Sequence, residues 1–320
     1  MKKVIITGAA GFVGSHVVTE FLNHDVTVIA VDVVNQPKNL PLENKKLNYF
    51  NLNVSNIQSL PSLCSCLNVD CFIHLAWDGS SGKKRSDVFA QLDNINTMIK
   101  CVTFAKKINC PKFICAGSIM EYESLQILNK NTDTSVFNKN SLYGFAKYVC
   151  HGLSKYVDGI DICWAMITNT YGPGEFSPRL INTTIRKILA DEPLSFSTCT
   201  QIYDFIFIDD TAKAFYNIAK KGRANKHYIL GTNPQPLKEY IKTLINVVNS
   251  SALNYAVFAG ESDSNLSHNA FISDTFSDGI LNKEELTPFE KGIELTTQWI
   301  KEQNFEQFHL WNSSETYRRC

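Results

Sequence analysis

The first half of the chain alternates short apolar runs with segments of helical length. The runs are rich in Val and Ile and apolar on both faces, which is typical of strands in a parallel sheet covered by helices. The expected strands are Lys3–Thr7, Thr27–Asp32, Leu47–Phe50, Cys71–Ala76, Lys112–Ala116 and Asp161–Ile167. The expected helices between them include Phe12–Asn23, Ser86–Lys107 and Ser141–Val157. This order predicts an α/β fold with a doubly wound parallel sheet of the Rossmann type.

The pattern changes after about residue 168. Helices are expected at Pro178–Ala190, Asp209–Lys221 and Pro288–Glu302, strands at Gln201–Ile208 and Lys226–Gly231, and a polar loop at Gly260–Gly279. No linker rich in Gly, Ser or Pro divides the two halves. We therefore expect a nucleotide-binding Rossmann domain of residues 1–168, with return segments near 201–231. A smaller C-terminal lobe of residues 169–200 and 232–320 is expected to bind the substrate.

Composition excludes several functional classes. The 320 residues carry 31 basic and 31 acidic side chains, whereas nucleic-acid and membrane-surface binding need a large basic excess. The apolar run before Thr7 is too short for a signal peptide, and no window approaches the ~20 apolar residues of a membrane span. We expect a cytoplasmic protein. Most of the ten cysteines lie in apolar runs, and the one close pair, Cys64-Ser-Cys66, lacks metal-site partners, so no metal is expected.

A glycine-rich loop, Gly8-Ala-Ala-Gly11-Phe-Val-Gly14, follows the first expected strand and opens the first expected helix. Gly8 permits a tight turn, Gly11 allows a pyrophosphate to approach, and Gly14 allows close packing of helix and strand. Asp32 ends the second strand, where a carboxylate binds both ribose hydroxyls and repels a 2′-phosphate. The alternative is a plain turn with an unrelated surface Asp. The pattern favours NAD over NADP.

Tyr143 and Lys147 lie four residues apart in a helical segment and share one face of it. A nearby ammonium group favours the phenolate form that an acid–base Tyr needs. Ser118 ends a strand 25 residues upstream, at the edge where such sheets bind ligands. A buried Tyr beside a solvated Lys is the alternative. Together with the glycine loop, the three residues predict hydride-transfer chemistry.

These motifs, with the NTYGPG segment at Asn169, resemble the extended short-chain dehydrogenase/reductases that act as epimerases, dehydratases or reductases of nucleotide sugars. The resemblance covers nearly the whole chain and implies a catalytic triad of Ser118, Tyr143 and Lys147. The cofactor-binding residues that it implies are Gly8, Gly11, Phe12, Val13, Gly14, Asp32, Asn53, Val54, Leu75, Ala76, Asn94, Tyr143 and Lys147. Substrate contacts are expected at Trp77, Ser118, Asn169, Arg179 and Tyr203.

Departures from the family pattern reduce the number of reactions that the resemblance allows. The 4,6-dehydratases carry Asp and Glu directly after the catalytic hydroxyl residue, where this chain has Ile119 and Met120. The fucose-forming 3,5-epimerase/reductases place a Cys at the Met120 position. Hydride transfer at C4 remains, and no role is assigned to Glu121.

We expect an NDP-4-keto-sugar 4-reductase that makes sugars for surface polysaccharides. A distinctive segment, Trp77–Arg85, supports this expectation, although a plain surface loop is the alternative reading. A 4-epimerase that retains NAD is the second hypothesis. A non-catalytic NAD-binding regulator or scaffold is the third, and the complete Ser/Tyr/Lys set argues against it.

The resemblance also implies a homodimer, in which two helices of each copy pair across a two-fold axis. The expected helices are Ser86–Lys107 and Ser141–Val157. The apolar stripe on the first comprises Val88, Leu92, Ile95, Ile99 and Val102. Packing of this stripe on its own sheet is the alternative.

Overall fold

A computed structural model describes residues 1–64, 68–130, 141–260 and 268–303 of the chain. The chain divides into two compact units. Unit 1 comprises residues 1–167, 209–230 and 273–284, and unit 2 comprises 168–208, 231–272 and the residues from 285 onward. Cys66 of the Cys64–Cys66 pair and part of the expected loop at Gly260–Gly279 lie outside the described residues.

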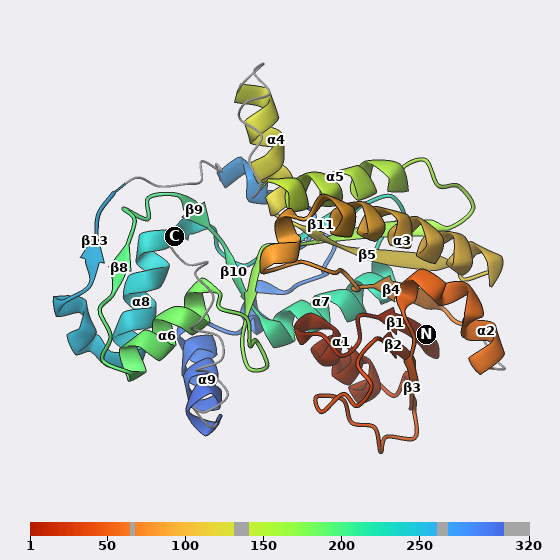
Figure 1. Ribbon diagram of the computed structural model, residues 1–320, viewed down its shortest axis with the longest axis horizontal. Helices are drawn as coiled ribbons and strands as arrows, with labels where there is room; N and C mark the ends of the chain where they lie inside the picture. Colours follow the sequence, from red (N-terminus) through yellow and green to blue (C-terminus); the bar gives the residue numbers. More distant parts are fainter. Residues whose placement is uncertain (65–67, 131–140, 261–267, 304–320) are drawn as a thin grey trace. The chain divides into compact units, whose positions relative to one another are not determined.

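Unit 1 is built on a seven-stranded parallel sheet with the strand order β11-β6-β5-β4-β1-β2-β3 (Figure 1). The order reverses direction at β1, as in a doubly wound fold, and this confirms the predicted fold class. The strands are β1 (Lys3–Thr7), β2 (Thr27–Asp32), β3 (Leu47–Asn51), β4 (Cys71–His74), β5 (Lys112–Ser118), β6 (Asp161–Ile167) and β11 (His227–Leu230).

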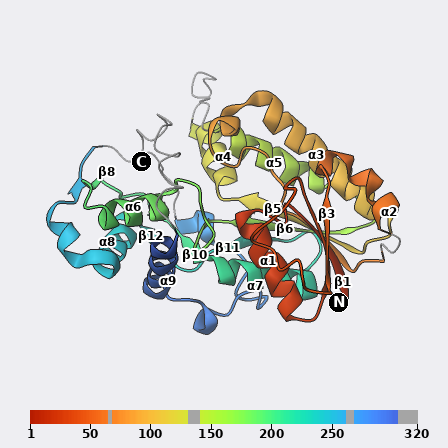
Figure 2. The same cartoon turned by 60° about the horizontal axis from the view of Figure 1, so that its bottom comes forward.

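Helices cover both faces of this sheet. In Figures 1 and 2, α3 and α5 lie over one face, and α1 and α7 lie over the other. Every central strand is therefore buried on both sides, which explains why the strands read as continuous apolar runs. The helices of unit 1 are α1 (Phe12–Asn23), α2 (Leu60–Leu63), α3 (Val88–Lys107), α4 (Met120–Lys130), α5 (Leu142–Ser154) and α7 (Ile208–Lys221, whose first residue belongs to unit 2). Two 3₁₀ helices, η1 (Val54–Ser59) and η2 (Lys83–Ser86), accompany them.

Local signals explain where the long helix α3 begins and ends. The Asp87 carboxylate accepts a hydrogen bond from the Ala90 amide at 2.9 Å, which caps the first turn. Asn109 follows the helix with a φ of 54°, a left-handed conformation that Asn tolerates and that terminates helices. Helix α3 consequently begins two residues later than the expected Ser86.

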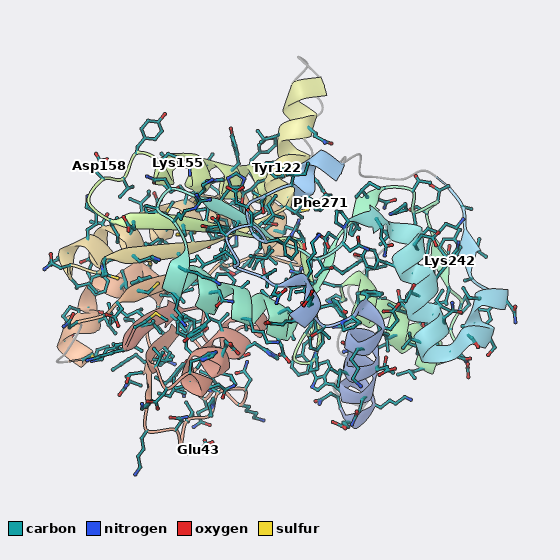
Figure 3. All side chains as sticks on the ribbon, turned by 180° about the vertical axis from the view of Figure 1, so that it is seen from behind. Glu43, Tyr122, Lys155, Asp158, Lys242 and Phe271 are labelled. Carbon is teal, nitrogen blue, oxygen red and sulfur yellow. The ribbon has the colours of Figure 1, made fainter. Side chains whose placement is uncertain are left out.

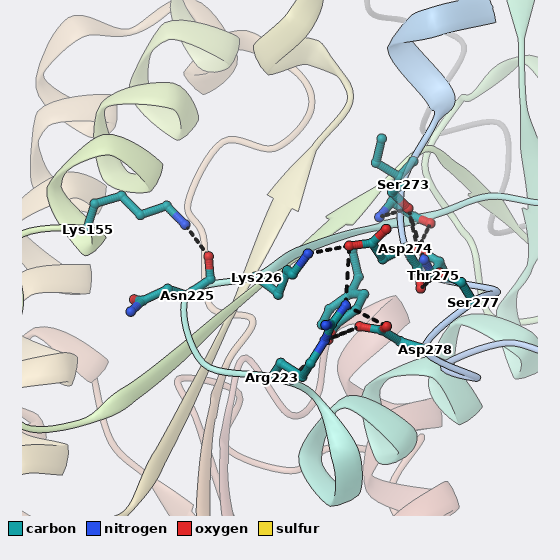
Figure 4. Close-up of polar contacts among 11 residues, drawn as sticks. Lys155, Arg223, Asn225, Lys226, Ser273, Asp274, Thr275, Ser277 and Asp278 are labelled. Carbon is teal, nitrogen blue, oxygen red and sulfur yellow. Dashed lines mark hydrogen bonds and ion pairs between the residues drawn. The ribbon is translucent and has the colours of Figure 1, made fainter.

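The segment 273–284 joins unit 1 through a charged cluster (Figure 4). The Arg223 guanidinium binds both oxygens of Asp278, at 2.7 Å from Nε and 2.6 Å from Nη2. The Tyr228 hydroxyl also donates to Asp278, at 2.9 Å, and Lys226 pairs with Asp274. These contacts attach the segment 273–284 to unit 1, whereas we expected it in the smaller lobe. The expectation was wrong because ion pairs between residues far apart in the sequence leave no local signal.

The described part of unit 2 contains three α-helices and three short strand pairs. The helices α6 (Leu180–Leu189), α8 (Leu237–Asn249) and α9 (Phe289–Glu302) pack on one another. The pairs are β7 (Asn169–Tyr171) with β10 (Phe205–Phe207), β9 (Ile202–Tyr203) with β12 (Gln235–Pro236), and β8 (Ser195–Phe196) with β13 (Val257–Phe258). Three 3₁₀ helices, η4 (Ser250–Asn254), η5 (His268–Phe271) and η6 (Lys283–Glu285), complete the described elements, the last of them at the boundary with unit 1. In the described part of the chain, no helix has the length and apolar character needed to cross a bilayer.

Asp204 interrupts the strand that we expected at Gln201–Ile208 and separates β9 from β10. Its buried carboxylate accepts hydrogen bonds from the amides of Thr232 and Asn233, at 2.8 Å and 3.0 Å. Gly231 precedes this turn, and a Cβ there would lie 2.0 Å from the Asp204 carboxylate. Burial raises the pKa of Asp204 to about 6, although the hydrogen bonds from Thr232 and Asn233 oppose that shift.

The raised pKa of Asp204 predicts how stability changes with pH. The folded state favours the protonated carboxyl. Its stabilising contribution to the free energy of unfolding is therefore greatest below about pH 4 and is lost as the pH rises to about 6. Urea unfolding of wild type and Asp204→Asn at a series of pH values measures this effect. The difference between the two unfolding free energies should fall by about 3 kcal/mol between pH 4 and pH 7. A difference that stays constant over this range would contradict the assignment.

Candidate functional site

The glycine loop after β1 is held by close contacts between backbones. Gly8 has a φ of +69°, and a Cβ there would lie 2.6 Å from the amide nitrogen of Ala76. A Cβ on Gly14 would lie 1.9 Å from the Gly8 carbonyl oxygen. A side chain is excluded at Gly8 by both the left-handed conformation and the lack of space, and at Gly14 by the lack of space alone. The loop therefore lies directly against the Leu75–Ala76 backbone that follows β4.

The first turn of α1 offers amide groups to an anion. Gly11 is the N-cap of this helix and provides no side chain to cap it. The amides of Phe12 and Val13 thus have no acceptor within the helix, and the positive end of the helix dipole points to the same place. This arrangement suits the pyrophosphate of a dinucleotide.

Asp32 lies beside the glycine loop at the end of β2. One carboxylate oxygen accepts from the Ala10 amide at 2.9 Å, and the other from the Val33 amide at 2.7 Å. A carboxylate has about four lone-pair positions, so acceptor capacity remains for ribose hydroxyls. Asn53 caps η1 by accepting from the Ser55 amide at 2.9 Å, and Val54 is the first residue of that turn. Adenine contacts by Asn53 and Val54 stay predictions.

Ser118, Tyr143 and Lys147 all belong to unit 1 and are buried, with exposed fractions of 8%, 8% and 4%. Ser118 is the last residue of β5, and its hydroxyl oxygen accepts from the Met120 amide at 3.3 Å. Lys147 lies one turn after Tyr143 on α5 and donates to the Ala116 carbonyl at 2.7 Å. Helix α5 is thereby tied to the strand that ends at Ser118.

Aromatic and cationic groups surround the Tyr143 ring. The Trp77 indole meets this ring edge-on, with 5.9 Å between centroids, and the Arg85 guanidinium carbon lies 4.4 Å from its centroid. The Lys147 ammonium lies 3.7 Å from the Trp77 ring centroid, within cation–π range. The Trp77 indole donates to Gln91 at 3.0 Å. The expected Trp77–Arg85 segment therefore contacts two of the three predicted catalytic residues.

Side chains of α3 hold this segment in place. The Asn94 amide forms a reciprocal pair with the backbone of Asp78, at 2.9 Å and 2.7 Å. Gln91 donates to the carbonyls of Gly79 and Lys84, at 3.3 Å and 3.0 Å. Gly79 has a φ of +79° and no room for a Cβ. Both polar groups of Asn94 thus stabilise the loop, and the cofactor contact inferred for Asn94 stays a prediction.

His74 lies beneath the site as a neutral group. Its Nδ1 is 2.9 Å from the Thr7 hydroxyl oxygen. Complete burial, together with the positive charge of Lys147, lowers the pKa of His74 to about 3. The imidazole is uncharged at neutral pH, so His74 adds no second cation beside Lys147.

The inferred substrate residues Asn169, Arg179 and Tyr203 lie in unit 2. The Asn169 amide donates to the Asp204 carbonyl at 3.1 Å, and the Tyr203 ring packs on Phe205 with 5.8 Å between centroids. Arg179 is the N-cap of α6, and its Nε is 3.5 Å from a Glu175 carboxylate oxygen. Substrate contacts by these three residues remain predictions.

Two features of the site had no assigned role in the sequence. Arg85 stacks on Tyr143, and Glu121 accepts a hydrogen bond from the Ser118 amide at 2.9 Å. Glu121 stands in the sequence as a carboxylate three residues after Ser118, but no local pattern assigns it a role. Within the described residues, no group of His, Cys, Asp and Glu side chains could hold a metal ion.

Comparison with known proteins shows which enzymes the chain is similar to. A UDP-glucuronate 4-epimerase of Thermodesulfobacterium geofontis is 24% identical over 94% of this chain and 97% of its own. A dTDP-4-dehydro-6-deoxyglucose reductase of Escherichia coli is also 24% identical, over 78% of this chain and 83% of its own. The solved UDP-N-acetylglucosamine 4-epimerase of Methanobrevibacter ruminantium has a TM-score of 0.76 at 22% identity, covering 95% of this chain and 99% of its own.

The family model that matches the chain is described as the NAD-dependent epimerase/dehydratase family, and it spans residues 4–231. This match includes the glycine loop, Asp32 and the Ser118, Tyr143 and Lys147 set. The chain belongs to the NAD-dependent epimerase/dehydratase family, as its motifs predicted, and its cofactor is NAD.

Proposed function

We propose that this protein is an NDP-4-keto-sugar 4-reductase that supplies sugars for surface polysaccharides. The proposal rests on the buried set of Ser118, Tyr143 and Lys147. The two residues directly after Ser118 cannot transfer protons. Ile119 is buried and apolar, and Met120 has no titratable group. The set supports acid–base chemistry at one oxygen, and its neighbours offer no second acid or base.

The same neighbourhood argues against elimination of water. Elimination needs a carboxylate that can reach a carbon beside the oxidised one, and Glu121 is the first carboxylate after Ser118. Both of its oxygens are engaged, one by the Ser118 amide and the Trp164 indole and the other by His151. Glu121 is also 1% exposed, so it cannot reach a substrate.

The residues of the chain account for the proton side of the reduction. Bound NADH would supply the hydride. Tyr143 would give its phenolic proton to the C4 oxygen, and the Lys147 ammonium, held by the Ala116 carbonyl, would stabilise the resulting phenolate. Ser118 accepts from the Met120 amide, so its own hydroxyl proton can be donated to the same substrate oxygen.

Trp77 and Arg85 would support these steps. The Trp77 indole covers the Lys147 ammonium and keeps water from that side of it. The Arg85 guanidinium lies over the Tyr143 ring, where its positive charge would stabilise the phenolate that proton transfer leaves behind. Both act on residues that a reductase and an epimerase share.

A 4-epimerase that retains NAD is the second candidate. It is favoured by the relative named UDP-glucuronate 4-epimerase, which aligns over 94% of this chain. The cofactor released from denatured protein, measured by mass and absorbance, separates the two. Tightly held NAD, with turnover that needs no added cofactor, would support the epimerase. Stoichiometric consumption of added NADH with a 4-keto nucleotide sugar would support the reductase.

The proposal predicts that Tyr143→Phe removes the acid–base group and preserves the fold. The rate of hydride transfer should fall by about 10²–10⁴-fold, the usual contribution of general acid–base catalysis. Single-turnover absorbance of NADH measures this rate. Tyr156→Phe is the matched control, because Tyr156 is 85% exposed. A Tyr143→Phe rate within about tenfold of wild type would contradict the assignment.

Asp32 predicts the cofactor preference. A 2′-phosphate would place about two negative charges against a carboxylate that the Ala10 amide already fixes. Wild type should therefore bind NADH more tightly than NADPH by roughly 30–150-fold. Asp32→Asn retains an acceptor for the Ala10 or the Val33 amide but removes the charge, and should bring the two dissociation constants together. Equal affinities in the wild type would show that Asp32 does not select the cofactor.

We propose that the protein is a homodimer through α3 and α5. Both helices carry large apolar side chains that are exposed in the single chain, and Phe89 reaches 79%. Large apolar side chains that are exposed on two helices in contact with each other indicate an interface. The exposed members are Val88, Phe89 and Leu92 on α3 and Tyr148, Val149 and Leu153 on α5. Within the predicted stripe, Val102 is buried and serves the core of unit 1, and Ile95 and Ile99 are half-buried.

Charge substitutions on this surface test the dimer. Light scattering of the wild type at micromolar concentration should give twice the chain mass of 36.0 kDa. Leu92→Glu combined with Leu153→Glu should give the single-chain mass, because burying two carboxylates without partners opposes association. Val257→Glu in unit 2, at a residue with 54% exposure, is the control. A wild type that is already monomeric would refute the proposal.

A further inference from the structure

Glu121 is a buried carboxylate in the first turn of α4, next to the predicted catalytic Ser118. One of its oxygens accepts from the Ser118 amide at 2.9 Å and from the Trp164 indole at 3.0 Å. Its other oxygen lies 3.1 Å from Nδ1 of His151. Strands β5 and β6 and helix α5 therefore meet at one side chain.

His151 connects this carboxylate to the catalytic helix. It lies on α5, four residues after Lys147 and eight after Tyr143, and so shares a helix face with both. Its ring stacks on the Trp164 indole of β6, with centroids 4.7 Å apart and an angle of 6°. The stacking fixes the orientation in which His151 meets Glu121.

Two glycines allow α4 to approach this closely. A Cβ on Gly117 would lie 2.1 Å from the Trp164 indole nitrogen and 2.8 Å from a Glu121 oxygen. A Cβ on Gly144 would lie 2.2 Å from the Met120 carbonyl oxygen. These glycines directly precede Ser118 and directly follow Tyr143. The first turn of α4 thus packs closely against the residues next to Ser118 and Tyr143.

The cluster is enclosed by further polar side chains. Tyr122, labelled at the base of α4 in Figure 3, has its hydroxyl 3.4 Å from Nε2 of His227. The His227 ring lies 5.8 Å from the His151 ring, and its pKa is lowered by burial and by the nearby His151. Glu121 is therefore shielded from solvent on this side as well.

Burying a carboxylate carries a large desolvation free energy. Its desolvation is repaid only when good geometry satisfies its oxygens, and apolar residues of similar size often stabilise a core as well or better. In Glu121 both oxygens have hydrogen-bond partners, and one of the oxygens accepts from the Ser118 backbone amide. The gain from such an arrangement is a defined geometry.

We propose that Glu121 is a positioning residue for hydride transfer: it ties the Ser118 backbone to α5 through His151, so that the Ser118 hydroxyl and the Tyr143 phenol address the same substrate oxygen. The inference rests on the proposed function, in which Ser118 and Tyr143 act together. Glu121 itself touches no substrate, because it is buried and both of its oxygens are engaged.

The test compares Glu121→Leu with Glu121→Gln in the full chain. Leu fills the space but leaves the Ser118 amide without its acceptor, and the single-turnover rate of hydride transfer should fall on the order of 10²-fold. Gln keeps an acceptor for Ser118 and Trp164 and an amide that can donate to His151, so its rate should stay within about tenfold. The NADH dissociation constant should change by less than about twofold in both variants, since the glycine loop and Asp32 lie on other strands.

Two readouts do not depend on turnover. Amide hydrogen exchange at Ser118 should be slow in wild type and Glu121→Gln and faster in Glu121→Leu, because the amide loses its acceptor. The NMR signal of the Trp164 indole N–H, assigned by its loss in Trp164→Phe, should shift in Glu121→Leu because the indole loses its acceptor. Glu43→Leu, at an exposed residue outside the Glu121 cluster, is the control and should resemble wild type in every readout.

His151→Phe provides a second variant if Glu121→Leu fails to fold. Phe keeps a ring to stack on Trp164 and removes the Nδ1 partner of Glu121, so the rate should fall about tenfold or more while NADH binding is kept. Wild-type rates in Glu121→Leu or in His151→Phe would overturn the inference. A loss of rate and of NADH affinity by the same factor would also overturn it, because that result indicates general loosening.

Tyr143→Phe in the same assay separates this inference from the proposed function. If Tyr143→Phe stops hydride transfer while Glu121→Leu does not slow it, the positioning role fails and the proposed function stands. If Tyr143→Phe transfers hydride at the wild-type rate, the proposed function fails, and the positioning role fails with it even where the Ser118 amide exchanges as expected.

Discussion

The close approach of two backbones at the carboxyl end of β1 is the constraint on which the predicted cofactor site of unit 1 depends. Gly8 turns with a positive φ against the Ala76 backbone, and Gly14 packs on the Gly8 carbonyl oxygen. These contacts bring the N-terminus of α1 to the sheet edge at which β2, β4 and β5 also end. Asp32, Ala76 and Ser118 lie at or just past those strand ends, so the position of each depends on this edge.

Electrostatics organise the site once this edge is in place. Lys147 is buried beside the Ala116 carbonyl and the Trp77 indole, and among the described residues no carboxylate pairs with it. In the proposed reaction, a carboxylate here would neutralise the cation that stabilises the Tyr143 phenolate. The nearby His74 is held neutral by its burial, and the carboxylate of Glu121 is directed to His151 and Trp164. The positive charge beside Tyr143 therefore remains available for the proposed proton transfer.

Sequence reasoning succeeded where the signal was local and failed where it was not. The strands of the sheet were recognised because burial on both faces demands continuous apolar runs. Helices α4 and α8 were missed, and α4 begins with the polar run Met120-Glu-Tyr-Glu-Ser124, whose buried Glu121 hides the helical pattern. The break at Asp204 was also missed, since its partners are 28 and 29 residues away in the chain.

The sequence by itself determined the parallel fold, the glycine loop, Asp32 and the Tyr143–Lys147 pair. Each of these follows from residues that are neighbours in the chain, where φ, helical period and strand burial act directly. Only the tertiary structure decided that Trp77 covers Lys147, that Arg85 stacks on Tyr143 and that Asn94 holds the Asp78 backbone. The same is true of the bond from Glu121 to His151. These contacts join different elements, and their geometry depends on how helices and loops pack on the sheet, which no local pattern encodes.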